Sequence, residues 1–299
     1  MSSVLYDVPG PRAKARNLIL SVVGGIALLG VGAFIVFRLA RTGQLAPEMW
    51  EILQYTSTQE RIFEGLVATL KAFFFAGIFS VVLGVLLAVA RLSDHLPIRW
   101  FATAFIELFR AVPLLITIFV FWQGFLINDP MWALVLGLTV YNGSVQAEVL
   151  RAGILSVPKG QVEAAYAIGM RKSQVMLTVQ IPQAVRAMMP TIISQLVVTL
   201  KDTSLGYIIV YEELLYVARQ FSDNTLINGA NPEVVLLGAV GALYVGICLL
   251  LSWFATWLEK RGRRAKTGIK VADAEPVAEP DKALDGKDGK DGKDGKDGK

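Results

Sequence analysis

The side chains best suited to binding chemistry in this sequence lie inside long apolar stretches. Lys201, Asp202, Thr203 and Ser204 stand together within the apolar stretch 184–210. A charge at the centre of a membrane helix costs at least about 2.5–3.5 kcal/mol, so Lys201 and Asp202 must pair with each other or face a polar cavity. Two interpretations therefore remain open for them: a solute pathway or gate, and a structural ion pair.

Four further polar side chains interrupt other apolar stretches and are candidates for the same pathway: Arg110, Tyr141, Asn142 and Gln146. Arg110 has an alternative, because a long side chain near a helix end can extend its charge to lipid headgroups. Glu148 and Arg151 also have an alternative interpretation to a pathway role, because they can form an ion pair at the membrane interface. The sequence contains no nucleophile–base pair, no metal-ligand cluster and no phosphate-binding loop. We therefore expect solute binding without catalysis, and neither a metal nor a nucleotide site in this chain.

These side chains must be positioned by membrane helices. Hydrophobic residues make up 54% of the 299 residues and charged residues only 18%, with a mean hydropathy of +0.52. This excludes an ordinary soluble enzyme, a disordered protein and a nucleic-acid binder. A bilayer core of roughly 30 Å needs about 20 apolar residues per helix. Six stretches qualify, and they predict an all-α integral membrane protein with six transmembrane helices: 17–40, 65–90, 108–127, 131–150, 184–210 and 234–258.

The distribution of Lys and Arg predicts the orientation, because cytoplasmic loops carry more of these residues. With a cytoplasmic N-terminus at 1–16, sixteen fall in cytoplasmic segments and four in external ones. Both termini are then cytoplasmic.

The first stretch, 17–40, is too long for the apolar region of a signal peptide and is followed by no cleavage site, so we expect a retained span. The tail 271–299 ends in five DGK repeats without Pro, which indicates solvated disorder.

The segment 151–183 is much longer and more ordered in pattern than a simple connection between membrane helices. Pro158 and Gly160 break the chain after the fourth span, and 161–168 contains good helix formers. Gly169 stands where a helix often ends in a left-handed conformation. We expect a second short helix, capped by Ser173 and ending before Pro182. The result is a helix–turn–helix at the membrane face, with Ala164 and Ala165 as a small docking surface for a soluble partner.

Several motifs resemble the permeases of bacterial ABC importers. Glu163, Ala164, Ala165, Gly169 and Pro182 match the family's EAA loop in type and spacing. The segments RAGI at 151–154 and LKDTSL at 200–205 are similar to the branch that imports polar amino acids. FRAVPLL at 109–115 is similar to the branch's FRGTPLL, with Ala-Val in place of Gly-Thr. The opening residues and the extra first span further resemble the glutamate-uptake permeases of high-GC Gram-positive bacteria.

The resemblance covers roughly 65–258 and implies a five-helix ABC type-1 permease core in a bacterial plasma membrane. It implies that 151–183 is the coupling loop, and that a cytoplasmic ATPase dimer binds the ATP and Mg²⁺. The other implied partners are a second permease subunit forming a heterodimer and an extracellular solute-binding protein, with membrane lipid around the spans. The implied substrate is glutamate. Alternatives are glutamine, aspartate or another polar amino acid by the same mechanism, or an ion-coupled secondary transporter.

Overall fold

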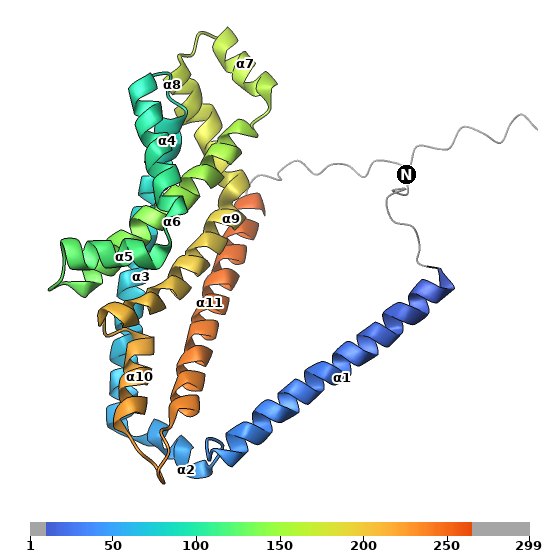
Figure 1. The fold of residues 1–299 in the computed structure, drawn as a ribbon. Coiled ribbons are helices and arrows are strands. Elements are labelled where there is room, and N and C mark those ends of the chain that lie inside the picture. The colour runs from blue at the N-terminus through green and yellow to red at the C-terminus, as the bar shows by residue number, and fades with distance from the viewer. Residues whose placement is uncertain (1–9, 265–299) are drawn as a thin grey trace, which may run out of the picture. The chain divides into compact units, whose positions relative to one another are not determined.

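The computed structural model describes residues 10–264, and the predicted disordered tail 271–299 lies outside them. Within these residues the protein is helical and contains no strand. The elements are α1 (Pro11–Arg41), α2 (Pro47–Trp50), η1 (Glu51–Gln54), α3 (Thr56–Arg91), α4 (Leu96–Ala111), α5 (Leu114–Gly124), α6 (Pro130–Leu155), α7 (Lys159–Ala167), α8 (Lys172–Val175), η2 (Met176–Gln180), α9 (Ile181–Asp202), η3 (Thr203–Ile209), α10 (Leu214–Asn224) and α11 (Glu233–Arg264). Figure 1 shows α7 and α8 at one end of the bundle and α2 and α10 at the other.

α6 is the central helix, and α3, α4, α5 and α9 pack around it. Glycines allow the closest approaches. A Cβ on Gly137 would come within 2.7 Å of Ile118 on α5, and one on Gly153 within 2.5 Å of Met188 on α9. At Gly84 on α3 it would lie 2.9 Å from Gln146. Small residues thus bring the helix backbones together, which is the usual basis of association in lipid.

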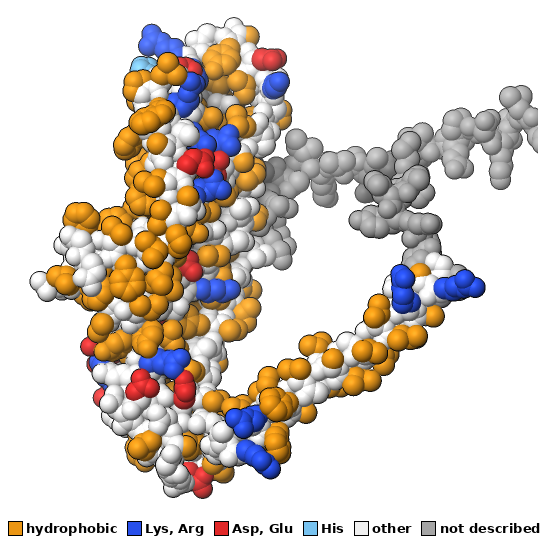
Figure 2. Space-filling view, viewed as in Figure 1, with side chains coloured by type: hydrophobic (Ala, Val, Ile, Leu, Met, Phe, Trp, Pro, Cys, Tyr) orange, Lys and Arg blue, Asp and Glu red, His pale blue; other side chains and the backbone are white. Residues whose placement is uncertain are grey.

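Four described helical segments are long and apolar enough to cross a membrane, and the bent pair α4–α5 passes the same test as a possible fifth. α6 is not among the four, because its polar residues lower its hydropathy; Asn142, Ser144 and Gln146 are buried inside the bundle. α1 differs from α6 in burial, because none of the residues in its apolar window is buried within the chain. Figure 2 shows hydrophobic side chains over much of the bundle surface, with groups of charged side chains between them at several levels along its length.

The prediction of one continuous span over 108–127 is wrong. The chain bends by 103° between α4 and α5. Val112 is extended (φ −78°, ψ 130°) ahead of Pro113, because the proline ring disfavours a helical conformation in the residue before it. The bend also changes the place of Arg110. It lies in the last turn of α4, about 21 Å along the helix from Leu96 at 1.5 Å per residue, and not at the end of the span near the coupling loop.

The predicted helix over 184–210 is present, but its last part has a different geometry. α9 gives way to the tighter 3₁₀ helix η3, which runs for seven residues; such runs rarely exceed three or four. η3 ends at Val210, which is left-handed (φ 62°, ψ 30°). Hydrogen bonds made by two residues that follow Val210 stabilise this reversal of the chain. Tyr211 Oη donates to the Ala68 carbonyl at 2.8 Å, and the buried Glu213 carboxylate accepts the N–H groups of Leu215 and Tyr216.

We predict that Val210→Gly stabilises the protein. A left-handed conformation costs an L-residue about 1–2 kcal/mol, and glycine avoids that cost. We expect a gain of about 1 kcal/mol, or about 2–4 °C in Tm for a protein of this size. The measurement is thermal unfolding of the purified protein in detergent. Val210→Ala is the control, because alanine keeps the Cβ that causes the strain; an equal gain with alanine would contradict this explanation.

Candidate functional site

The loop 151–183 forms a helical hairpin whose turn is made by Gly169. α7 begins directly after Pro158 and ends at Ala167. Gly169 has a φ of +84°, and its N–H donates to the Tyr166 carbonyl at 2.9 Å. This confirms the predicted left-handed turn, which favours glycine because it has no Cβ. The segment therefore presents a short helix beyond the ends of the bundle helices (Figure 1).

The three residues of the EAA motif divide between two faces of α7. Glu163 and Ala164 are exposed, whereas Ala165 is only 7% exposed and lies on a helix that packs against α8 and η2. Glu163 has no ion pair among the described residues. A charged side chain next to a small one is thus available on the outer face of α7, while Ala165 fixes the helix against the rest of the loop.

The second half of the loop differs from the prediction. Its helix begins after Arg171, whose N–H donates to Gln174 Oε1 at 2.8 Å, so Ser173 is not the cap. It also does not end before Pro182. A π turn, η2, joins α8 to α9 without a break. Pro182 is the second residue of α9, which directly follows η2, and the change to π geometry there alters the backbone hydrogen-bond register next to the residue that lacks an N–H. The loop 151–183 is therefore continuous with α9, part of a candidate spanning helix.

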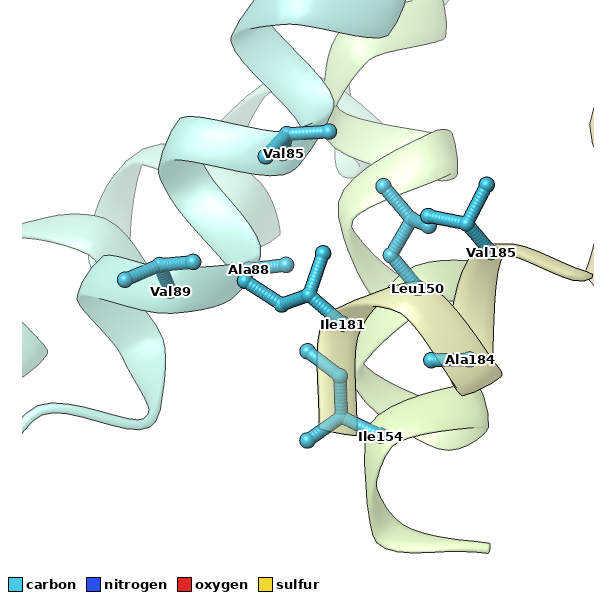
Figure 3. A pocket seen from close by; sticks show the side chains of 8 residues that line it. All are labelled: Val85, Ala88, Val89, Leu150, Ile154, Ile181, Ala184 and Val185. Carbon is cyan, nitrogen blue, oxygen red and sulfur yellow. The ribbon is translucent and has the colours of Figure 1, made fainter. Parts of the chain in front are cut away.

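The first turn of α9 lies in an apolar joint between α3 and α6. Figure 3 shows Ile181 between Ala88 of α3 and Ile154 of α6. The joint surrounds a pocket of only about 10 Å³, lined by aliphatic side chains alone. Such a pocket has no group to bind a polar ligand. It connects the end of the loop to the core through packing.

Ion pairs connect three helices at the same end of the bundle. The Arg91 guanidinium on α3 contacts Glu148 on α6 at 2.5 Å and Glu107 on α4 at 2.8 Å. Arg151 contacts Glu148 at 3.0 Å, as the sequence indicated, but within a larger network than a single pair. Lys172 on α8 pairs with Asp94 in the α3–α4 turn. The Lys172 ammonium holds the pKa of the Asp94 carboxyl below its usual value, so this contact persists as an ion pair at neutral pH.

Asn142 and Gln146 lie inside the bundle, and both are fully buried. Gln195 Nε2 on α9 donates to Asn142 Oδ1 at 2.8 Å, and Gln146 Nε2 donates to Ser80 Oγ on α3 at 3.0 Å. These two bonds connect α6 to α9 and to α3. Asn142 Nδ2 and Gln146 Oε1 have no hydrogen-bond partner among the described residues. Tyr141 is half-buried on the same helix.

The polar residues after position 200 stay closer to the surface of the bundle. Lys201 is exposed and Asp202 is half-buried, and they form no ion pair with each other in the described chain. Thr203 is buried and donates to the Leu200 carbonyl at 2.6 Å. Ser204 donates to the Lys201 carbonyl at 2.8 Å. Arg110, at the end of α4, is exposed as well.

Sequence analysis missed a polar face along α9. Its exposed residues recur every three or four positions and include Arg186, Thr191, Ser194 and Lys201. The segment Lys172–Ile209, which contains them, has the lowest hydropathy of the four candidate spans, 1.2 against 2.5–2.7. Two of the seven exposed residues of α9, Arg186 and Lys201, are charged, and three, Ala187, Pro190 and Val198, are apolar. The two charges favour contact with another protein subunit or water over lipid at those positions. The helical spacing of the polar residues was a signal available in the sequence.

Known proteins share both the sequence pattern and this fold. Residues 80–264 match the family described as binding-protein-dependent transport system inner membrane component. The chain belongs to this family. It is 37% identical over 257 residues to the glutamate transport system permease protein GluD of Corynebacterium glutamicum, covering 83% of this chain and 92% of that protein. It is 32% identical over 212 residues to the Escherichia coli glutamate/aspartate import permease GltK, covering 67% and 92%.

Solved structures agree with this assignment. A crystal structure of an amino acid ABC transporter with histidines matches with a TM-score of 0.62 and 28% identity, over 70% of this chain and 98% of that one. The inward-facing methionine ABC transporter MetNI has the same fold, with a TM-score of 0.59 at 20% identity. The chain is thus a permease subunit of the ABC importer type, and an ion-coupled secondary transporter is not supported.

We predict that Glu148→Gln destabilises the permease, because it leaves Arg91 and Arg151 without their shared carboxylate. Both Arg91 and Glu148 side chains are about one-fifth exposed, 18% and 20%, so we expect a loss of about 1–3 kcal/mol. Glu107→Gln is the matched control. Its side chain is 56% exposed, and exposed pairs contribute at most about 1 kcal/mol. Thermal unfolding in detergent measures both, and equal losses would contradict a central role for Glu148.

Proposed function

We propose that this permease forms the membrane pathway of an ABC importer for L-glutamate in a bacterial plasma membrane. The observation that carries the proposal is the 37% identity to GluD over 83% of this chain and 92% of that protein. GltK, whose printed substrates are glutamate and aspartate, supports an acidic amino acid. The probable glutamine permease GlnM of Bacillus subtilis, at 36% identity over 66% of this chain, makes glutamine the second candidate.

Energy enters through the coupling loop 151–183. A cytoplasmic ATPase dimer binds ATP and Mg²⁺, and a groove on it receives α7 with Glu163 and Ala164 on its outer face. Because α8, η2 and α9 are continuous, closure of the ATPases moves the loop and α9 together. The Lys172–Asp94 and Arg91–Glu148 contacts carry the same displacement to α3, α4 and α6. The bundle then changes its orientation as a rigid body around the substrate pathway.

The substrate pathway runs along the polar face of α9. Lys201, Asp202, Thr203 and Ser204, together with Arg110 and Tyr141, supply the donors and acceptors that a zwitterion needs. A second, homologous permease subunit completes the pathway opposite this face, and an extracellular solute-binding protein delivers glutamate. The buried hydrogen bonds of Asn142 and Gln146 support a structural role for these two residues.

The proposed topology has six spans with both termini cytoplasmic. α4 and α5 together make one crossing, and α6 makes another although it is polar. The excess of Lys and Arg at the coupling-loop end supports a cytoplasmic position for that end. The tail 271–299 is proposed to be disordered and dispensable for transport.

The decisive experiment is reconstitution of the permease in proteoliposomes with its ATPase, second subunit and binding protein. We expect ATP-driven uptake of L-glutamate that competes with aspartate more strongly than with glutamine. Uptake that needs no ATP but follows an ion gradient would overturn the proposal. Stronger competition by glutamine would move the assignment to the second candidate.

We predict that Gly169→Val lowers ATP-driven uptake at least tenfold, because a β-branched residue opposes the left-handed turn at φ +84°. Glu163→Lys should do the same by reversing the charge on the outer face of α7. The matched control is Gly160→Ala, since a Cβ there meets nothing within 4 Å and Gly160 has an ordinary helical backbone. Uptake per permease molecule in the membrane is the measurement. Normal uptake by both loop variants would mean that this loop does not couple ATP hydrolysis to transport.

We also predict that Lys201→Met and Asp202→Asn each reduce uptake more than tenfold without loss of the protein from the membrane. Lys201 is exposed on the polar face, so its removal leaves packing intact while it deletes the cation of the pathway. Val198→Ala, one turn earlier on the same exposed side, is the control and should stay within twofold of the parent. Unchanged uptake in both charge variants would exclude them from the pathway.

A further inference from the structure

α9 and α11 border a cavity of about 160 Å³ between the coupling loop and Lys201, and this cavity is open to the surface of the described chain. Three hydroxyl groups border it: Ser194 from α9, and Ser252 and Thr256 from α11. The other lining side chains, Val197 and Ala255 among them, are apolar. The hydroxyl oxygens are therefore the polar side-chain atoms that a molecule in this cavity would meet.

All three hydroxyl protons are already engaged by the helix backbone. Ser194 Oγ donates to the Pro190 carbonyl at 2.9 Å, Ser252 Oγ to the Cys248 carbonyl at 2.8 Å, and Thr256 Oγ1 to the Ser252 carbonyl at 2.9 Å. A hydroxyl whose proton is committed in this way offers only its lone pairs. The cavity thus accepts hydrogen bonds and does not donate them. A primary ammonium group fits this chemistry, and a carboxylate does not.

The complementary group stands two helical turns away. Lys201 lies seven residues after Ser194 on α9, so it shares a face with Ser194 at about 10.5 Å along the axis. It is exposed and forms no ion pair within the described residues. The flexible side chain can extend part of that distance toward the cavity. An acceptor site and a cation so spaced match the α-ammonium group and the distal carboxylate of an acidic amino acid, while its α-carboxylate must point out of the open side of the cavity, away from the hydroxyl oxygens.

We propose that the hydroxyl cavity binds the α-ammonium group of the transported amino acid while Lys201 pairs with its side-chain carboxylate. The site is a resting position for substrate along the second half of α9, between Ser194 and Lys201. This inference rests on the proposed function and adds the chemical basis by which the permease itself, apart from any binding protein, recognises an acidic amino acid.

The test uses substrate protection of an engineered cysteine. Cys248 is the single cysteine of the sequence, so Cys248→Ala gives a background into which Val197→Cys places one thiol at the cavity. The full-length permease in complex with its ATPase and second subunit is labelled with a maleimide, with L-glutamate, glutarate or L-norvaline present. Glutarate lacks the ammonium group, and L-norvaline lacks the distal carboxylate. We expect L-glutamate to slow labelling at least fivefold. Each analogue should need about tenfold higher concentration than L-glutamate to give the same protection.

Two variants separate the contributions of the two ends. Ser252→Ala combined with Thr256→Val should raise the half-protective concentration of L-glutamate about tenfold and leave that of glutarate unchanged, as expected for loss of hydrogen bonds to a charged group. Lys201→Met should remove the preference for L-glutamate over L-norvaline. Thr42→Val is the matched control. The Thr42 hydroxyl also donates to the carbonyl four residues earlier, at 3.0 Å, but Thr42 lies at the end of α1 and does not line the cavity.

The outcomes distinguish this inference from the proposed function. Equal protection by all three compounds, or none by L-glutamate, would overturn the cavity site if the parent complex still drives L-glutamate uptake. Protection with the expected selectivity, in a complex that drives no uptake, would support the site and contradict the proposed function. Ile193→Cys repeats the measurement at a second lining position, so poor folding of one cysteine variant does not decide the result.

Discussion

The constraint on which this structure depends is that a backbone inside a bilayer must satisfy its own hydrogen bonds. It explains why the chain remains helical from the coupling loop to the far end of α9 despite two prolines. A π turn ahead of Pro182 keeps the helix unbroken, and Pro190 lies inside α9. No break in the helix therefore separates the loop 151–183 from the exposed side of α9.

The same constraint explains the composition of α6. This helix is surrounded by other helices, so its polar side chains bond to protein and its glycines permit close contact. Asn142 and Gln146 hold α9 and α3 at fixed depths, while the Arg91–Glu148–Arg151 network fixes the end nearest the coupling loop. α9 differs, since its exposed side stays polar. The bundle thus combines a central helix that its neighbours enclose with one helix whose exposed side carries polar residues.

Local chemistry in the sequence was enough to predict much of this arrangement. Gly169 predicted the turn of the loop 151–183, because it directly follows a run of good helix formers, where glycine often ends a helix in a left-handed conformation. The apolar stretches predicted where α1, α3 and α11 lie. Run length alone could not reveal the break at Pro113 within an apolar stretch, although the proline itself signalled it. The 3₁₀ geometry of η3 and the burial of Asn142 depend on neighbours distant in sequence, so no local pattern encoded them.

The bend between α4 and α5 has a consequence for the surrounding lipid. α4 has sixteen residues, which span about 24 Å at 1.5 Å per residue. With α5 turned by 103°, that segment adds almost nothing along the axis of α4. Even when upright, α4 is shorter than a hydrocarbon core of roughly 30 Å, so a crossing made by this pair requires the bilayer to thin locally beside it. Membrane thickness, and with it acyl-chain length, becomes a physical variable that acts on this side of the permease.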